Sequence, residues 1–371
     1  MPTERAHGVQ IAKMCEAFSE LGYRVVLMRP KRRNPITEDV AGYYNLRVTL
    51  EEMVLWVPDW KWLGPLYFPI LSVYFSLSAS VRARFVRTEV FVVTRDPAVA
   101  ILTPSAVLEV HALPGRFRLL YALAYRRARA IISTNSWKAE KLALMFGVRR
   151  ERICTLANGI DLEQFSQSIT ALDAREKLAL PMDKKIVLFV GSLLSWKGAD
   201  TLSQAAAHVP HDVNIVIVGG SPEQVGLYRA RYPLSNLFFV SHQTHLHVPL
   251  YMKAADILVL PTSPRSEEAI YETSPLKLLE YMASERPIIA SELPAIRELV
   301  DGTQVRFFEA DNSRALAEAI CAVLCEPEAQ RAVRVKNAYH KVRGYTWRRR
   351  AQSILSNCNN GVYENPFNLP V

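Results

Sequence analysis

The chain lacks the cysteine pattern of a disulfide-stapled or zinc-binding protein. No cysteine pair with metal-ligand spacing is followed by a second such pair. We therefore predict reduced, mostly buried thiols in a cytosolic protein. The residues after Met1 also lack the apolar core of a signal peptide. The cysteines are Cys15, Cys154, Cys321, Cys325 and Cys358.

Several catalytic motifs are also absent. No Asp-x-Asp pair occurs, so a diphosphate ligand would have to be bound by lysines and helix N-termini rather than through a divalent metal. We accordingly expect no metal and no other cofactor. No Gly-x-Ser-x-Gly elbow is present, which argues against a serine hydrolase. The basic residues are dispersed and match no nucleic-acid recognition module.

The composition is that of a globular protein, with 50% hydrophobic and 22% charged residues in 371. This length favours two domains. The net charge of +9 favours anionic partners such as nucleotide diphosphates or acidic lipid headgroups. An uncharged run, 62–81, is long enough to span a bilayer, but its prolines and serines favour a buried or interfacial helix. The arginine-rich helix expected at 117–129 could face a membrane or simply water.

Helical and strand patterns alternate along the chain, which predicts parallel sheets covered by helices on both faces. In a doubly wound sheet the first strand is normally central, yet only five residues precede the first helix. We therefore expect Met1 to be internal and a further strand to lie upstream. Residues 31–60 are expected to form a loop. Helices are expected at 6–22, 69–86, 117–129, 136–146 and 313–342, and strands at 23–28, 90–94, 106–111, 130–134, 153–160, 185–191, 214–220, 237–240, 257–260, 287–290 and 305–308.

Two glutamates, Glu272 and Glu280, flank a turn and the start of a helix. Thr273 or Ser274 could cap this helix, and Pro275 suits its first turn. The free N–H groups at such a helix start bind phosphate. The spacing suits a ligand with a central diphosphate and hydroxyl groups at both ends, such as a nucleotide sugar. An ordinary capped helix with two solvated acids would show the same pattern.

Other candidate residues follow strands. Gly191 to Gly198 follows a strand and contains Lys197, which could contact a phosphate or merely cap a loop. His111 ends a predicted strand, where open α/β sheets bind ligands, although a lone histidine is often structural. The run His242 to His247 has no metal-ligand spacing and is expected to line a pocket.

In combination these motifs resemble glycosyltransferase family 4, the retaining transferases of the GT-B fold. The resemblance spans nearly the whole chain and rests on five motifs in the family's order. The motifs are Glu109-x-His111, Asn158-Gly-Ile-Asp161, Trp196-Lys-Gly198, Glu272-x7-Glu280 with Ser-Pro-Leu-Lys between, and Arg286-Pro-Ile-Ile-Ala-Ser291.

The resemblance implies two Rossmann-like doubly wound parallel-sheet domains, the first lacking its first strand. It implies that Lys197 binds the donor diphosphate, that Glu280 holds the ribose, and that Glu272 and His111 contact the transferred sugar. It further implies a cleft between the domains. The expected donor-binding set is Gly191, Ser192, Lys197, Arg265, Ser274, Pro275, Leu276, Lys277 and Glu280, with Gly8 and Glu109 on the acceptor side. The expected divisions are an acceptor-side domain 1–165, a linker 166–184, a nucleotide-sugar domain 185–344, and a terminal helix 345–358 that crosses back to the first domain.

Two features depart from the family pattern. Ser192 stands where members often carry arginine, so either Ser192 forms a hydrogen bond instead or another cation such as Arg265 or Lys277 substitutes. The first strand is also missing. The expected function is a metal-independent, retaining transfer of a sugar from a nucleoside-diphosphate-sugar to a glycan or lipid-linked acceptor, for a cell-surface polysaccharide. The alternatives are a sugar-nucleotide epimerase and a degenerate nucleotide-binding protein without turnover. The expected location is the cytoplasm, with peripheral binding to an anionic membrane surface and no nucleic-acid partner.

Overall fold

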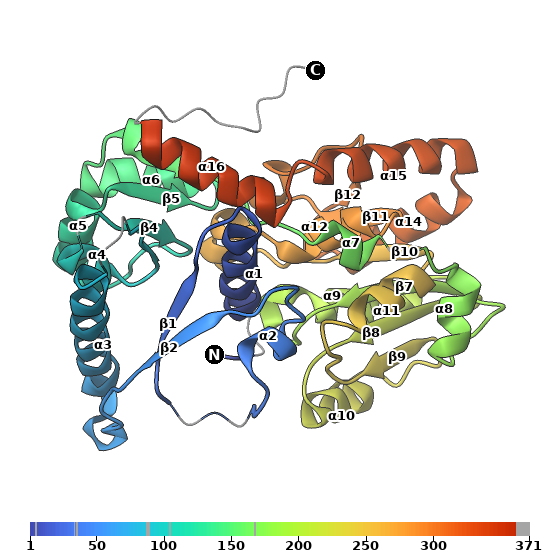
Figure 1. Ribbon diagram of the computed structural model, residues 1–371. Coiled ribbons are helices and arrows are strands. Elements are labelled where there is room, and N and C mark those ends of the chain that lie inside the picture. The colour runs from blue at the N-terminus through green and yellow to red at the C-terminus, as the bar shows by residue number, and fades with distance from the viewer. Residues whose placement is uncertain are drawn as a thin grey trace. The chain divides into compact units, whose positions relative to one another are not determined.

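The computed structural model describes residues 1–3, 6–32, 34, 36–86, 90–103, 105–166 and 168–360. The chain divides into two compact units. Unit 1 comprises Met1–Asn158 together with the terminal segment from Trp347, and unit 2 comprises Gly159–Thr346 (Figure 1). The chain therefore enters unit 2 from unit 1 and returns to unit 1 at its end.

Unit 2 is built on a six-stranded parallel sheet. Its order, β12-β11-β10-β7-β8-β9, places β7 inside the sheet and makes β12 an edge strand, as predicted for 305–308. Val and Ile dominate these strands because the sheet is buried on both faces. The strands are β7 Lys185–Val190, β8 Val213–Val218, β9 Leu237–Val240, β10 Ile257–Leu260, β11 Ile288–Ser291 and β12 Arg306–Phe308.

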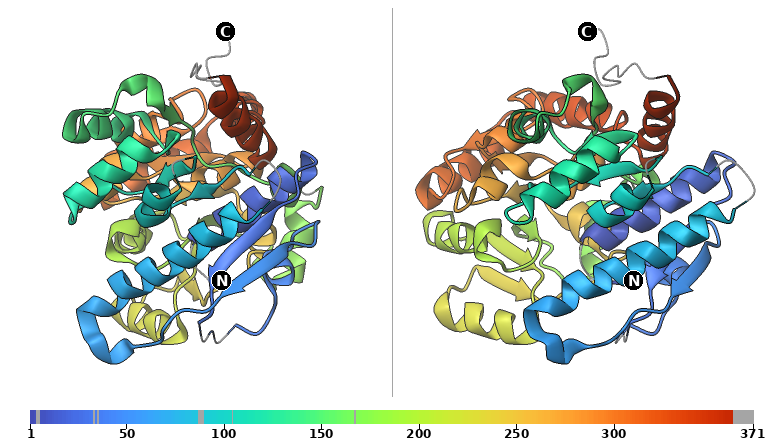
Figure 2. Two further views of the ribbon diagram at one scale, coloured as in Figure 1. Left: turned by 60° about the vertical axis from the view of Figure 1, so that its left-hand side comes forward. Right: turned by 90° about the vertical axis from the view of Figure 1, so that its left-hand side faces the viewer.

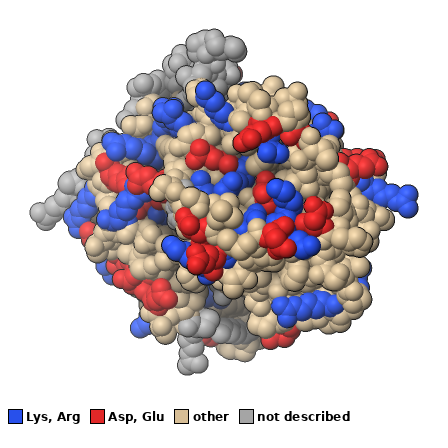
Figure 3. Space-filling view, turned by 90° about the vertical axis from the view of Figure 1, so that its right-hand side faces the viewer, with Lys and Arg blue, Asp and Glu red and all other residues tan. Residues whose placement is uncertain are grey.

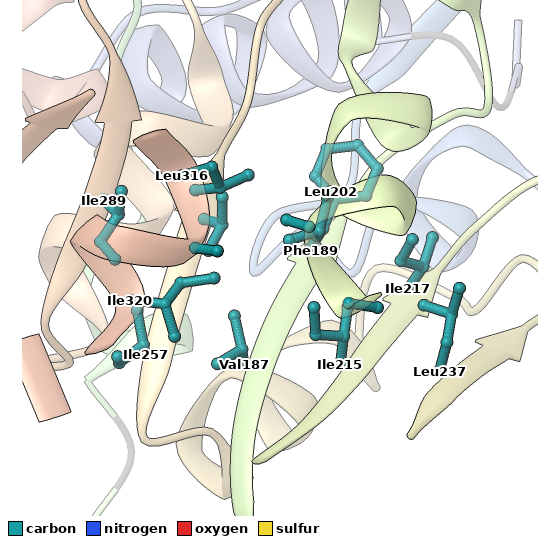
Figure 4. Packing of buried hydrophobic residues seen from close by; sticks show 14 of the residues in the cluster. Val187, Phe189, Leu202, Ile215, Ile217, Leu237, Ile257, Ile289, Leu316 and Ile320 are labelled. Carbon is teal, nitrogen blue, oxygen red and sulfur yellow. The ribbon is translucent and has the colours of Figure 1, made fainter. Parts of the chain in front are cut away.

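The core of unit 2 forms where helices pack on this sheet (Figure 4). Val187 and Phe189 of the central strand lie beside Leu202 of α9 and Ile320 of α14, all at most 1% exposed. This packing holds the strand ends rigidly for the loops that follow them. The helices and turns of unit 2 are α7 Leu162–Phe165, α8 Ala171–Lys177, η3 Ser195–Lys197, α9 Ala199–Ala205, η4 Ala206–His208, α10 Pro222–Arg231, α11 Val248–Ala254, η5 Glu268–Glu272, α12 Leu276–Ala283, α13 Pro294–Arg297, α14 Ser313–Cys325 and α15 Glu328–Val342.

Unit 1 contains two parallel sheets in the part of the chain that the structure describes. One pairs β1 Val26–Pro30 with β2 Glu51–Leu55, and the other has the order β3-β4-β5-β6. The upstream strand expected from the sequence remains a prediction. The remaining elements of unit 1 are α1 Ala6–Glu20, α2 Val40–Tyr43, η1 Lys61–Leu66, α3 Tyr67–Arg84, β3 Val93–Thr94, α4 Pro97–Leu102, β4 Val107–Val110, α5 Arg118–Arg127, β5 Ala130–Ser133, α6 Ser136–Phe146, η2 Arg150–Arg152, β6 Ile153–Thr155 and α16 Trp347–Asn360.

Two stretches that the sequence predicts to be a loop and a linker contain regular elements. The stretch 31–60 contains α2 and β2. The sequence of β2 lacks the usual apolar pattern because its Glu51 and Glu52 pair with Arg24 and Arg29. The predicted linker 166–184 contains α8, which belongs to unit 2. Its Arg175 is buried, donates to the carbonyl of Ala254 and pairs with Asp256 at 2.6 Å. The ion pair of Arg175 in the second stretch is largely buried, whereas the Arg24–Glu51 pair of β2 is exposed.

Glycines let the loops after three strands of unit 2 come together. Gly198 has φ +78°, and a Cβ there would lie 1.6 Å from the carbonyl oxygen of Pro261, which follows β10. Gly219, after β8, has φ +143°, and a Cβ there would lie 1.9 Å from the carbonyl oxygen of Gly191. Only glycine fits these two positions, so the loops after β7, β8 and β10 are held backbone to backbone.

We predict that Gly198→Ala lowers the thermal unfolding midpoint by about 5 °C, because the methyl group meets the Pro261 carbonyl and the backbone is strained. Gly226→Ala is the matched control. Gly226 lies in α10 with open space around its Cβ position, so alanine there should raise the midpoint by about 1–3 °C. Equal effects at the two positions would contradict the close loop packing.

Candidate functional site

Lys197 lies at the end of η3, after the central strand of unit 2. Its Nζ lies 3.7 Å from the centroid of the Trp196 ring. Burial, with the nearby charge of Lys277, lowers the pKa of Lys197 to about 8, against a smaller opposing effect of Glu268. Two mutually repelling ammonium groups at the carboxyl edge of a sheet favour an anionic ligand, which would relieve the repulsion.

Ser192 is exposed in the loop that leads to Lys197. Arg265, expected to supply the missing cation, is about half exposed, and its Nε lies 3.9 Å from Asp311 Oδ2. Asp311 in turn accepts hydrogen bonds from Ser263 at 2.7 Å and Thr201 at 3.2 Å. The contact between Asp311 and Arg265 is long, and about half of the Arg265 side chain remains exposed to water.

Helix α12, which follows the turn between the two glutamates, lacks the side-chain cap that the sequence predicts. Pro275 occupies the N-cap position of α12, and no side chain caps the helix, so the prediction that Thr273 or Ser274 does so is wrong. The reason is local. The preceding η5 is a π-helix that ends at Glu272, and proline is held in an extended conformation before Leu276. The positive end of α12 therefore carries no side-chain cap.

Glu280 is buried on the inner face of α12. Its Oε2 lies 2.5 Å from Lys277 Nζ and its Oε1 lies 3.6 Å from His245 Nε2. Burial alone would raise the pKa of Glu280, but Lys277 and His245 outweigh it and hold the pKa below the ordinary range. The carboxylate is therefore charged at neutral pH and able to accept hydrogen bonds from hydroxyl groups.

His245 and Gln164 belong to this cluster and were not predicted individually. Gln164 Nε2 lies 2.8 Å from His245 Nδ1 and donates to the His245 carbonyl at 3.0 Å. The ring of Phe165 meets the His245 ring edge to face at 5.5 Å. Asp161, the last residue of the Asn-Gly-Ile-Asp motif, caps the short helix that carries Gln164. That cap was the one sequence signal that could have pointed to Gln164.

Tyr281 fixes α12 against the central strand. Its hydroxyl accepts the N–H of Val190 at 2.9 Å, one residue before Gly191. Both groups are buried. Lys197, Lys277, Glu280 and the start of α12 are thereby held in one region of unit 2, as expected from the sequence. Glu272 is half-buried at the end of η5 beside this region.

Unit 1 carries the other predicted cluster, at the end of β4. His111 Nε2 lies 3.0 Å from Glu109 Oε1, and the carbonyl of His111 accepts a hydrogen bond from Lys138 at 2.8 Å. Burial lowers the pKa of His111 despite the opposing effect of Glu109, while Arg95 and Arg350 add to the lowering. The imidazole is therefore neutral at pH 7, and the carboxylate favours a proton on Nε2.

Glu109 was expected on the acceptor side, but its carboxylate is enclosed by protein. Its Oε1 accepts from Gln10 at 2.8 Å and from Arg350 at 2.5 Å. Arg350 also donates to the carbonyl of Ala157 at 2.9 Å. Burial would raise the pKa of Glu109, but Arg350, His111 and Arg95 hold it well below its usual range. Glu109 thus fits a role in orienting His111 rather than in touching an acceptor.

Gly8, the other residue expected on the acceptor side, lies within helix α1 and not in a loop. A Cβ there would lie 2.0 Å from the hydroxyl of Tyr44, whose oxygen also accepts the N–H of Thr3 at 2.8 Å. The lack of a side chain at Gly8 is explained by this packing. Across the described ranges, no group of three or more His, Cys, Asp and Glu side chains could hold a metal ion.

We predict that Arg350→Met lowers the thermal unfolding midpoint by about 6–12 °C, because it leaves the buried Glu109 carboxylate short of a cation, a loss of about 3 kcal/mol. Arg350→Met with Glu109→Gln should recover part of this loss. Arg348→Met, at an exposed position of the same helix, should change the midpoint by under about 2 °C. A double variant no better than Arg350→Met alone would contradict a direct coupling.

Two family models match most of the chain. Residues 171–341 match the family model described as glycosyl transferases group 1, and residues 7–164 match glycosyltransferase family 4. The D-inositol 3-phosphate glycosyltransferase of Xylanimonas cellulosilytica is 27% identical over 239 residues, covering 61% of this chain and 55% of that protein. The enzyme of that name from Mycolicibacterium paratuberculosis is 28% identical over 250 residues, covering 64% and 53%. The chain thus spans about half the length of these relatives.

Solved structures show the same fold. Anabaena Alr3699/HepE, in complex with UDP and glucose, superposes with a TM-score of 0.74 at 16% identity, covering 97% of both chains. Sucrose-phosphate synthase from Thermosynechococcus elongatus gives a TM-score of 0.74 at 20% identity, covering 95% of this chain and 92% of that one. The two family matches together span most of residues 7–341, and the chain belongs to the family 4 type of glycosyltransferases.

Proposed function

We propose that this glycosyltransferase moves a sugar from a nucleoside-diphosphate-sugar to a glycan or lipid-linked acceptor, with retention at the anomeric carbon and without a metal, in cell-surface polysaccharide synthesis. The observation that carries the donor class is the joint placement of Lys197, Lys277 and the uncapped start of α12 in unit 2. A diphosphate matches all three, since it accepts hydrogen bonds from N–H groups and stabilises both ammonium ions.

The nucleoside end of the donor is assigned to Glu280. Its charged, buried carboxylate can accept hydrogen bonds from two vicinal ribose hydroxyls, and His245 and Gln164 beside it can contact the base or the ribose. UDP is the first nucleotide to test because HepE was solved with it. A thermal-shift screen of UDP-, GDP- and ADP-sugars identifies the donor.

During transfer, negative charge develops on the departing diphosphate. Lys197, Lys277 and the N-terminal dipole of α12 would stabilise that charge without reorganising, which is the main source of rate in such a reaction. Glu272 is assigned to hydroxyls of the transferred sugar. The neutral His111, oriented by Glu109 and Lys138, is assigned to a hydrogen bond with the sugar near the reacting carbon.

We predict that Glu272→Ala lowers kcat for sugar transfer at least a hundredfold, with the Kd for the nucleoside diphosphate changed less than about threefold. Glu280→Ala should instead raise that Kd at least tenfold, since it removes a ribose contact. Glu318→Ala, at an exposed position of α14, is the control and should change neither constant. Unchanged kcat in Glu272→Ala would refute the assignment.

The acceptor is sought with the wild-type chain and a panel of glycans, lipid-linked sugars and D-inositol 3-phosphate, the last because curated relatives are named for it. A new sugar nucleotide formed without acceptor would identify an epimerase and refute transfer. Nucleotide binding with no turnover in any donor and acceptor combination would identify a degenerate binding protein.

The lowered pKa of Lys197 makes nucleotide affinity depend on pH. Below about pH 8 its amine is a cation, and above that value it is neutral unless a bound diphosphate holds the proton. We therefore predict that the Kd for UDP rises about tenfold from pH 7 to pH 9. Lys197→Arg stays protonated over this range and should flatten the profile. Calorimetry at several pH values measures both, and a wild-type profile as flat as that of the arginine variant would contradict the assignment.

A further inference from the structure

The outer face of helix α3 is apolar and exposed to water. Leu66, Val73, Leu77 and Val81 recur at helical spacing and are each 47–61% exposed. No Asp, Glu, Lys, Arg or His occurs from Trp62 to Val81. A helix at a water-exposed surface normally carries charged residues on its outer side, so this face indicates a partner.

The inner face of α3 holds the helix within unit 1. Ser72 donates to Asp96 at 2.7 Å, and Thr103 donates to Ser80 at 3.0 Å. The 23-residue segment Trp62–Arg84 is long and apolar enough to cross a membrane, and 28% of its most apolar window is buried. Gly64, with φ 55° and ψ −121°, breaks that segment before α3 begins. These contacts and the break favour a helix that lies along a surface over one that spans a bilayer.

Helix α5 adds a second exposed apolar strip. Leu119 is 88% exposed, and Leu120 and Leu123 are also exposed. The ends of α3 and α5 converge on one helix, because Arg84 donates to the carbonyl of Leu102 and Arg127 donates to that of Ile101, both in α4. Figure 2 shows α3 and α5 on the same side of unit 1. We call the exposed residues of α3 and α5, with the tryptophans before α3, the apolar face.

The apolar face has cations at its ends and no acid among its helices. Helices α3, α4 and α5 contain no Asp or Glu. Arginines end α3 and α5, and Arg32 stacks over the Tyr67 and Phe68 rings at 5.8 and 5.5 Å. By contrast, the face of the molecule in Figure 3 shows blue and red side chains interspersed, as expected of a solvated surface.

Aromatic side chains gather where α3 begins. The rings of Trp56 and Trp60 meet Tyr74 edge to face at 6.3 and 6.1 Å, and Trp62 is 80% exposed. Tryptophan beside leucine, with arginine at the margins, is the composition of surfaces that enter the headgroup region of a bilayer. A second copy of the chain would bring arginines against arginines, so self-association is disfavoured.

We propose that the apolar face docks unit 1 on an anionic lipid bilayer, with α3 lying in the plane of the headgroups. The leucine, valine and tryptophan side chains enter the apolar boundary, and the arginines reach acidic headgroups. This surface shares no residue with the clusters around His111 and Glu280.

The test is co-sedimentation of the full chain with vesicles of phosphatidylcholine containing about 30 mol% phosphatidylglycerol, against pure phosphatidylcholine, at low salt. We expect binding to the anionic vesicles to be at least tenfold tighter. Leu77→Glu and Leu119→Glu should each weaken it at least tenfold. Leu227→Glu, at a 71% exposed leucine of α10 in unit 2, should change it less than twofold.

Circular dichroism and the thermal midpoint check that each variant is folded. If Leu77→Glu misfolds, Leu119→Glu still tests the proposal, because Leu119 is 88% exposed and its replacement should not disturb the core. No binding by the folded wild-type chain, equal binding to both vesicle types, or equal weakening by Leu227→Glu would overturn the proposal. Dimerisation abolished by Leu77→Glu, without vesicle binding, would assign the face to a second copy. Binding of UDP by the same variants reports separately on the donor site.

Discussion

The organisation of unit 1 depends on a single buried carboxylate. Glu109, on β4, accepts from Gln10 of α1 and Arg350 of α16 and lies 3.0 Å from His111 Nε2. A buried anion is tolerated only when it is fully paired, so the two helices and the strand are obliged to meet there. The same charge fixes the orientation of His111. The placement of one candidate catalytic group and the closure of unit 1 on its terminal helix are therefore the same interaction.

Unit 2 brings several positive groups close together. Lys197 and Lys277 lie close enough for the charge of Lys277 to lower the pKa of Lys197, and the start of α12 adds a third positive influence. Backbone contacts at Gly198 and Gly219, together with the Tyr281 hydroxyl, hold these groups in place despite their repulsion. Glu280 and Glu268 offset part of this positive potential, and an anionic ligand would offset more of it.

The sequence predicted the strands of unit 2 well, because continuous Val and Ile runs in a doubly covered sheet leave little ambiguity. It failed at β2, whose Glu51 and Glu52 pair with Arg24 and Arg29 near the surface, and at α8, where the buried Arg175 pairs with Asp256. Motif spacing predicted Lys197, Glu280 and His111 as site residues, and their roles stay predictions. Motif spacing could not predict the role of Gln164 or the partners of Glu109, because these contacts join residues up to 241 positions apart.

The crossing of the chain back to unit 1 has a consequence for biosynthesis. Glu109 and Arg350 are 241 residues apart, and all of unit 2 lies between them. Ribosomes add about 5–20 residues per second, so Arg350 is synthesised on the order of tens of seconds after Glu109. During that interval unit 1 stays incomplete, because its terminal helix follows unit 2 in the chain. Unit 1, although most of it is synthesised first, thus cannot complete its fold until unit 2 has been synthesised, and its apolar helices are the segments that nascent-chain chaperones would have to shield.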